Sequence, residues 1–265
     1  MTRPQPPSSN QTPVPLADLV TYLDTYLESS AFQDYGPNGL QVEGRTPIKK
    51  IATGVSACAE LFEVAAARGM DAVLVHHGLF WEKQPSPLTG VLYRRVAQLI
   101  ESRLSLIAYH LPLDAHLEVG NNILAAKALG LEGLERFGVA GDAPIGFRGV
   151  FETSLDTEEL SRRCRRVFAQ EPLLLGRRPA DGLVTAAVVS GAAQSLLHEA
   201  IGAGIDIFIT GEASEWVSNL ANEAGVCFVA AGHYATECLG IRALGEHVRD
   251  RFGIEADFVD VPNPV

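Results

Sequence analysis

The chain has 265 residues, of which 47% are hydrophobic and 20% are charged, and its formal net charge is −11 at pH 7. This is the composition of a soluble globular protein, and no apolar run reaches the roughly 20 residues that a membrane-spanning helix needs. The acidic balance, without a basic run, disfavours nucleic acid as a partner. The four cysteines show no CxxC spacing, which predicts reduced thiols in a cytoplasmic protein.

The start of the chain differs in character from the rest. Residues 1–15 are rich in Pro, Gln and Ser and contain no apolar segment of the kind found in secretion signals, so we expect a disordered tail. From Leu16 to Leu27, apolar residues recur at helical spacing, which predicts a first amphipathic helix. A loop rich in turn-forming residues follows at 35–44.

Beyond this loop, short apolar segments alternate with helical patterns. Strands are expected near 48–55, 72–76, 104–109, 184–190, 205–209, 226–230 and 255–260, and helices near 57–68, 91–102, 121–129, 193–203, 213–224 and 238–252. Buried strands that alternate with helices are typical of an α/β fold with a largely parallel sheet.

The stretch 138–182 is less regular. The segment FRGVF at 147–151 is expected to form an edge strand. Asp156 and Glu159 form a capping box before a helical segment rich in arginine. The arginines of this segment either cover a solvated helix face or form a phosphate-binding patch.

An internal repeat suggests that the chain contains two related halves. With a shift of 135 residues, the segment 51–77 aligns without gaps on 186–212. Identical residues meet at Ala52, Ala57, Leu61, Ala65, Gly69 and Asp71. Both segments follow the order strand, helix, Gly-x-Asp, strand and polar end, which predicts a duplicated βαβ unit; the alternative is that unrelated βαβ units share this pattern.

Residues that can bind metals follow four of the predicted strands. The strand at 72–76 ends in His76 and His77, which point to opposite faces of a regular strand and can share a site only where the strand ends. The other three segments contain His110, Asp114 and His116, then Glu212, then His233 and Glu237. Open α/β sheets place their sites at the carboxyl ends of strands, so five of the seven histidines lie where a site is expected. Imidazoles and carboxylates suit Zn, Fe, Mn, Co or Ni, and a carboxylate can bridge two ions about 3.5–4 Å apart.

Several longer motifs occur together in this chain. They are YGPNGLQVEG, AVLVHHG, YHLPLDAH with its following GNN, ITGE, GHYATE and the closing DVPNPV. Through them the chain, from Leu16 to Val265, resembles the Nif-three-like dinuclear-metal proteins, often labelled GTP cyclohydrolase I type 2.

The resemblance implies a fold, a metal centre and an assembly. The fold would be a single unit, 16–265, made of two intertwined and related α/β/α halves, about 16–115 plus 232–265 and 116–231, with the metal cleft between them. The chain would bind two divalent metal ions through His76, His77, Asp114, His233 and Glu237. It would form a homo-oligomer, a toroidal hexamer, and it resembles the compact bacterial form because it has no additional domain in the middle.

Other polar residues near the expected cleft have open roles. His110 and His116 would orient ligands or bind substrate, or serve packing alone. Asn38 is expected in a tight turn beside the cleft as a further contact to ligands or substrate. Glu212, which lies opposite His77 in the repeat, and His110 are candidates for the general base. Trp81 is expected to wall the pocket or to cover the sheet.

Three functions remain open. The first is a divalent-metal-dependent hydrolase of the GTP cyclohydrolase I type 2 kind, which would open a nucleotide or related heterocycle and release formate. The second is a phosphoester hydrolase, which the same two-metal geometry serves. The third is a metal-binding scaffold or regulatory protein. A small-molecule substrate such as a nucleotide would be held without a Walker loop, because no GxxxxGK[ST] motif occurs.

Overall fold

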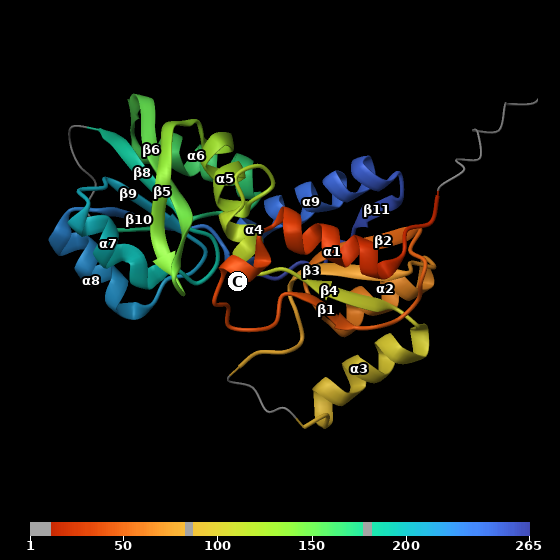
Figure 1. The fold of residues 1–265 in the computed structure, drawn as a ribbon. Coiled ribbons are helices and arrows are strands. Elements are labelled where there is room, and N and C mark those ends of the chain that lie inside the picture. The colour runs from red at the N-terminus through yellow and green to blue at the C-terminus, as the bar shows by residue number, and fades with distance from the viewer. Residues whose placement is uncertain (1–11, 83–86, 177–181) are drawn as a thin grey trace, which may run out of the picture.

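The computed structural model describes residues 12–82, 87–176 and 182–265, and in it the strands divide between two sheets (Figure 1). The first sheet has the order β1-β4-β3-β2-β11, with β1 (Gly39–Val42), β2 (Lys50–Ser56), β3 (Ala72–His77), β4 (Ser105–Ala108) and β11 (Glu255–Phe258). The second has the order β5-β6-β8-β9-β10-β7, with β5 (Leu131–Ala140), β6 (Ala143–Leu155), β7 (Leu173–Leu175), β8 (Leu183–Val188), β9 (Ile207–Thr210) and β10 (Cys227–Ala230).

Helices cover both faces of each sheet. They are α1 (Leu16–Tyr26), α2 (Ala59–Ala67), α3 (Gly90–Ser102), α4 (Leu111–Ala115), α5 (Asn121–Leu129), α6 (Thr157–Phe168), α7 (Leu197–Gly202), α8 (Glu215–Ala224) and α9 (His233–Phe252), with single 3₁₀ turns at Ser29–Ala31 and Gln194–Leu196. On the first sheet, α1 and α9 pack on one face and α2 and α3 on the other. On the second sheet, α5 and α6 cover one face and α7 and α8 the other. The fold is therefore a pair of α/β/α halves, as expected from the sequence.

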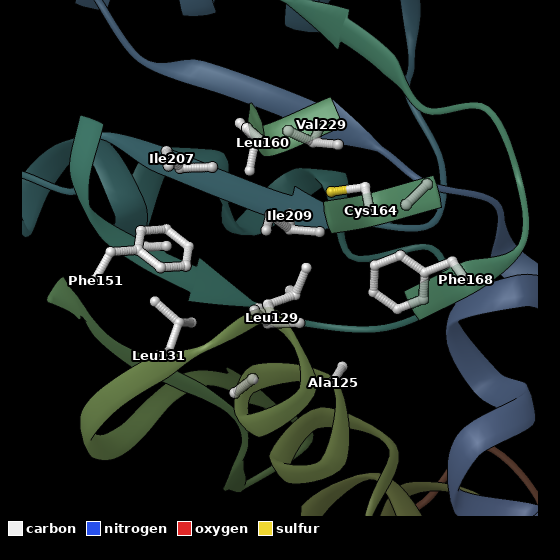
Figure 2. Close-up of a cluster of buried hydrophobic side chains, with 14 of the residues drawn as sticks. Ala125, Leu129, Leu131, Phe151, Leu160, Cys164, Phe168, Ile207, Ile209 and Val229 are labelled. Carbon is white, nitrogen blue, oxygen red and sulfur yellow. The ribbon is translucent and has the colours of Figure 1, made fainter. Parts of the chain in front are cut away.

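The core between the second sheet and α5 and α6 illustrates how each half is stabilised. Figure 2 shows Leu129, Leu160 and Cys164 from the helices against Ile209 and Val229 from the strands. These side chains are at most 1% exposed, and full burial of an aliphatic side chain stabilises a fold by about 1.5–3 kcal/mol. Burial also raises the pKa of the Cys164 thiol to about 12, so this cysteine is a packing residue.

Strand register supports the internal repeat. In the first half, Ile51 on β2 pairs in parallel with Ala72 on β3. In the second half, Ala186 on β8 pairs in parallel with Ile207 on β9. Each residue of the second pair lies 135 positions after its counterpart, so the two βαβ units agree in register as well as in element order.

The aspartate of the repeated Gly-x-Asp has one role in both halves. Asp71 Oδ2 accepts hydrogen bonds from the backbone N–H groups of residues 49 and 50, at 2.8 and 3.1 Å. Asp206 Oδ2 accepts from the N–H groups of residues 184 and 185, at 3.1 and 2.8 Å. Each carboxylate thereby binds the start of the neighbouring strand and satisfies backbone donors there.

Three expectations from the sequence need correction. Residues 147–151 belong to β6, which is not an edge strand, because it pairs with β5 on one side and β8 on the other. The first sheet is parallel apart from β1, but the second is parallel only from β8 to β10, since its other pairings, by β5, β6 and β7, are antiparallel. The expected tail at 1–15 is too long: Val14 is buried and exchanges two backbone hydrogen bonds with Ile48, while residues 1–11 lie outside the described part.

The missed strands β1, β5 and β7 contain glycine, charged residues or few residues, which weakens a strand pattern.

Within the described ranges, no helix combines the length and the apolar character needed to cross a membrane.

Candidate metal centre

The five residues expected to bind metals meet at one place between the two halves. His76 and His77 end β3, Asp114 lies on α4, and His233 and Glu237 lie at the start of α9. The last two are four residues apart and share a helix face. His76, Asp114 and Glu237 are buried, and His77 and His233 are half-buried.

The Glu237 carboxylate lies at the centre of this group. Its Oε1 atom is 3.5 Å from His76 Nε2 and 3.2 Å from His233 Nε2. Its Oε2 atom is 3.2 Å from His77 Nε2. Asp114 Oδ2 lies 3.6 Å from His76 Nε2 on the other side. One carboxylate therefore faces donor atoms in two directions.

Two buried atoms of this group lack hydrogen-bond partners. His76 Nε2 and Glu237 Oε2 make no hydrogen bond within the described part of the chain, although neither is reached by solvent. A buried polar atom without a partner costs about 1–3 kcal/mol, so such atoms call for an explanation. A cation fits here because ligand atoms of His76, Asp114 and Glu237 lie within 4.8 Å of one another, as do those of His77, His233 and Glu237. These buried groups could hold a metal ion.

Electrostatics keeps the central carboxylate ionised. Burial alone would raise the pKa of Glu237, but the imidazoles of His77 and His76 hold it well below its usual range. Burial alone would lower the pKa of His76, but the carboxylates of Asp114 and Glu237 raise it to about 9. A cation would take the place of the proton in this network, because metal ligands must be deprotonated.

Neighbouring groups orient the side chains at the centre. Tyr109 O accepts from Nδ1 of His76 at 3.0 Å, which leaves Nε2 directed at the carboxylates. Asp114 Oδ1 accepts from Asn121 Nδ2 at 2.9 Å and from Ser190 Oγ at 2.8 Å. Hydrogen bonds of this kind fix the ring and carboxylate orientations that a metal site requires.

Glu212, a candidate general base, lies behind His233. Its Oε1 atom is 2.5 Å from His233 Nδ1, and it is not among the residues that line the cleft. A carboxylate in this position orients the imidazole and raises its basicity. Glu212 is therefore suited to orient His233.

Gly191 provides the space into which the Glu237 side chain fits. A Cβ atom added at Gly191 would lie 2.4 Å from Glu237 Oε1 and 3.3 Å from His233 Nε2. The backbone φ of Gly191 is +67°, a conformation that favours glycine. Only a residue without a side chain lets α9 approach the loop after β8 this closely.

His110 lies beside the centre, held from behind by a buried aspartate that the sequence interpretation missed. Its ring centroid is 5.1 Å from that of His76 and 5.6 Å from that of His77. Asp34 Oδ1 lies 2.7 Å from His110 Nδ1. Burial opposes ionisation of Asp34, yet the hydrogen bond and charge of His110, together with hydrogen bonds from Asn38 and the Leu111 N–H, lower the pKa of this carboxyl. Asp34 directly precedes the YGPNG motif, and that position was its only signal in the sequence.

Asn38 completes this arrangement. Its Oδ1 atom accepts from the backbone N–H of His110 at 2.9 Å, and its Nδ2 atom donates to Asp34 Oδ2 at 2.9 Å. The expected turn residue thus positions both members of the Asp34–His110 pair.

His116, whose role the sequence left open between the site and packing, is not among the described residues that line the cavity. Its Nε2 atom is 3.0 Å from Tyr26 O, and its Nδ1 atom accepts from the backbone N–H groups of Glu118 and Val119 at 3.2 Å. The ring packs on Tyr26, with centroids 4.4 Å apart. Nε2 thus contacts the end of α1 and Nδ1 the segment after α4, as expected of a packing residue.

A cavity of about 1030 Å³ opens beside the metal candidates. Its walls include the end of β2 with the start of α2 (54–61) and the segment after β8 (190–193, 195 and 196), which correspond in the internal repeat. His77, His110 and Glu237 face it, and Trp81 and Tyr35 add aromatic surface. The Trp81 ring meets His110 edge to face at 5.1 Å, so this tryptophan walls the pocket.

Fold and site together define an α/β protein of duplicated design with a buried histidine–carboxylate cluster suited to a metal ion. The chain belongs to the Duf34/NIF3 (NGG1p interacting factor 3) family, whose sequence model matches residues 14–264. This confirms the family expected from the motifs.

Curated relatives are similar over nearly their whole length. The GTP cyclohydrolase 1 type 2 homolog of Pseudomonas aeruginosa is 41% identical over 251 residues, covering 95% of this chain and 99% of the relative. The protein of the same name from Allochromatium vinosum is 41% identical over 249 residues, covering 93% and 96%.

Solved structures share the fold. The protein ybgI, described as of unknown function, superimposes with a TM-score of 0.89 at 37% identity, covering 95% of this chain and 100% of that one. The protein TTHA1606 from Thermus thermophilus gives a TM-score of 0.86 at 36% identity, again covering 95% and 100%.

Proposed function

We propose that this protein is a divalent-metal-dependent hydrolase with a dinuclear centre that acts on a nucleotide or a related heterocycle, in the manner of a GTP cyclohydrolase 1 type 2. The observation that carries the proposal is the position of Glu237, whose carboxylate is shared by two groups of possible ligands, one with His76 and Asp114 and one with His77 and His233. A carboxylate so placed is suited to bridge two ions. The names of the curated relatives support the choice of substrate class.

The ligand set divides naturally around Glu237. His76 and Asp114 would hold one ion with it, and His77 and His233 would hold the other. Two divalent ions at such a site lower the pKa of water and stabilise negative charge on the substrate. The identity of the ions would be one of Zn, Fe, Mn, Co or Ni, which accept imidazole and carboxylate together.

His110 is our choice for the proton-transferring residue. An ionised carboxylate only accepts hydrogen bonds, so the His110 Nδ1–H group donates to Asp34. The Nε2 atom then carries no proton, and it belongs to a ring that lines the cavity. Glu212 lacks this access because it is behind His233. An imidazole in such a position can accept a proton from the attacking water and deliver it to the leaving nitrogen.

The cavity favours an enzyme over a purely structural metal site or scaffold. A structural site is closed by protein ligands, whereas a catalytic site keeps room for substrate. The cavity has a volume typical of small-molecule sites. Trp81, Tyr35 and His110 offer ring faces and edges against which a planar heterocycle can pack.

The decisive experiment is GTP turnover by protein of known metal content, with formate and free phosphate measured in parallel. A His76→Ala/His77→Ala variant serves as the control. Formate release that requires both metal and the histidine pair is the expected result. Phosphate alone would identify a phosphoester hydrolase, and neither product from metal-loaded protein would favour a scaffold or regulatory role. The toroidal homohexamer stays a prediction, which the mass from light scattering would test.

A further inference from the structure

Arg95 on α3 lines the same cavity as the metal candidates but belongs to a different wall. The cavity includes Arg95 together with the end of β2 and the start of α2, at 54–61. Gln98, one turn further along α3, donates to Ala59 O at 3.1 Å and joins α3 to the start of α2. None of the five metal candidates lies on α3.

The Arg95 guanidinium has no partner within the described part of the chain. It forms none of the ion pairs, hydrogen bonds or aromatic contacts found there, although its side chain is half-buried. Arg163 on α6, which is also half-buried, is by contrast paired with Glu159 at 2.7 Å. Glu60 also lines the cavity but makes no ion pair with Arg95. A half-buried guanidinium without a partner is prepared to bind an anion.

Apart from its histidines, the described lining of the cavity is poor in positive charge. Among its described lining residues, Arg95 is the single lysine or arginine, while Glu60, Asp114 and Glu237 contribute carboxylates. In a chain of net charge −11, an anionic substrate is repelled unless a local cation offsets the field. Guanidinium groups bind phosphate through paired, charge-assisted hydrogen bonds.

We propose that Arg95 is the anchor for the phosphate end of the substrate, so that the ring of the substrate, and not its phosphate, faces the histidine–carboxylate cluster. This inference rests on the proposed function and deepens it by assigning an orientation. In this orientation the heterocycle, and not a phosphoester bond, would lie nearest the cluster, which favours ring opening. A phosphoester hydrolase would require the reverse orientation.

Binding measurements on the full-length protein test the anchor without depending on turnover. The probes are GTP and guanosine, titrated calorimetrically into metal-loaded wild type, Arg95→Gln, Arg95→Lys and Arg94→Gln. Arg94 is the matched control, because it is the exposed neighbour on α3 and does not line the cavity. Chelator-treated wild type shows whether metals hold the phosphates.

The expected result is specific to the phosphate group. Arg95→Gln should weaken GTP binding by about tenfold to a hundredfold, as for loss of a charge-assisted hydrogen bond, and leave guanosine binding unchanged. Arg95→Lys should lose less, and Arg94→Gln should bind as wild type does. In chelator-treated wild type, the preference for GTP over guanosine should persist.

Three results would overturn the anchor: no GTP binding by wild type, equal GTP affinity in wild type and Arg95→Gln, or a preference for GTP that disappears with the metals. Equal melting temperatures of the variants show that any loss is not due to misfolding. The proposed function fails separately, by absence of bound metal or of product, whatever Arg95 does.

Discussion

His76 Nε2 and Glu237 Oε1 lie 3.5 Å apart in the buried interior, where neither His76 Nε2 nor Glu237 Oε2 finds a hydrogen-bond partner within the described residues. Two distant segments of the chain are needed to create this pair, since β3 supplies the histidine and α9 supplies the glutamate. A cation bound here would satisfy both of these buried atoms, which leads to the following predictions for metal binding.

Replacement of the central carboxylate should remove metal. We expect Glu237→Gln to lose at least one ion per chain, because the neutral amide cannot supply two anionic oxygens to the ions. Plasma emission spectrometry of the purified protein measures this. Glu246→Gln on the exposed face of the same helix is the matched control and should keep the wild-type metal content. Full metal occupancy in Glu237→Gln would contradict the ligand assignment.

An alanine at Gly191 should weaken metal binding in addition to straining the backbone. Gly191 and Gly204 have the same φ of +67°, but a Cβ at Gly204 meets nothing within 4 Å, whereas at Gly191 it would overlap Glu237. Both alanine variants therefore carry the left-handed strain of about 1–2 kcal/mol. Gly191→Ala should in addition lose metal, as measured by competition with a chromogenic chelator, and Gly204→Ala should not. Equal affinities would show that the close approach is unimportant.

The Asp34–His110 pair should matter for turnover and not for metal content. His110→Asn should lower the rate by about a hundredfold or more, the usual contribution of a general acid or base, with both ions retained. Asp34→Asn should lower the rate by about tenfold to a hundredfold, as for loss of an orienting partner. Rates and metal content are measured on the same samples. Loss of an ion from His110→Asn would instead make His110 a ligand.

A histidine remote from the centre should make the stability depend on pH. His247 on α9 lies 2.7 Å from the Tyr22 hydroxyl through Nε2 and stacks on Tyr26 with centroids 4.0 Å apart. Burial lowers the pKa of His247 below its ordinary value of 6.5. The unfolded chain therefore binds the proton more readily, and the stability contributed by neutral His247 is present above pH 6.5 and is lost as the pH falls towards the lower folded value.

We accordingly expect the difference in melting temperature between wild type and His247→Gln to shrink between about pH 7.5 and 5.5. Thermal unfolding followed by circular dichroism at several pH values provides the measurement. His198→Gln, at the exposed stack with Trp216, is the control and should show no such trend. A difference that stays constant across this range would refute the assignment.

Much of the architecture followed from local patterns. Alternating apolar segments determined the strands β2, β3, β4, β8, β9 and β10, because buried parallel strands must be continuously apolar. The repeat of 51–77 in 186–212 determined that the two halves are related, and the structure bears this out in the register of Ile51 and Ala186. The placement of histidines after strands likewise determined where a site would lie, since strand ends converge at one edge of a sheet.

Tertiary structure alone decided which polar residues belong to the site. His110 and His116 are six positions apart in one motif, yet one lines the cavity and the other closes a helix, because α4 turns the chain between them. Asp34, Ser190 and Asn121 reach the centre from separate segments, and no local pattern reports such contacts. Arg95 is indistinguishable from Arg94 in sequence, and only the packing of α3 directs one of them into the cavity. The identity of a strand or helix depends on its own residues, whereas a site depends on side chains that distant segments bring together.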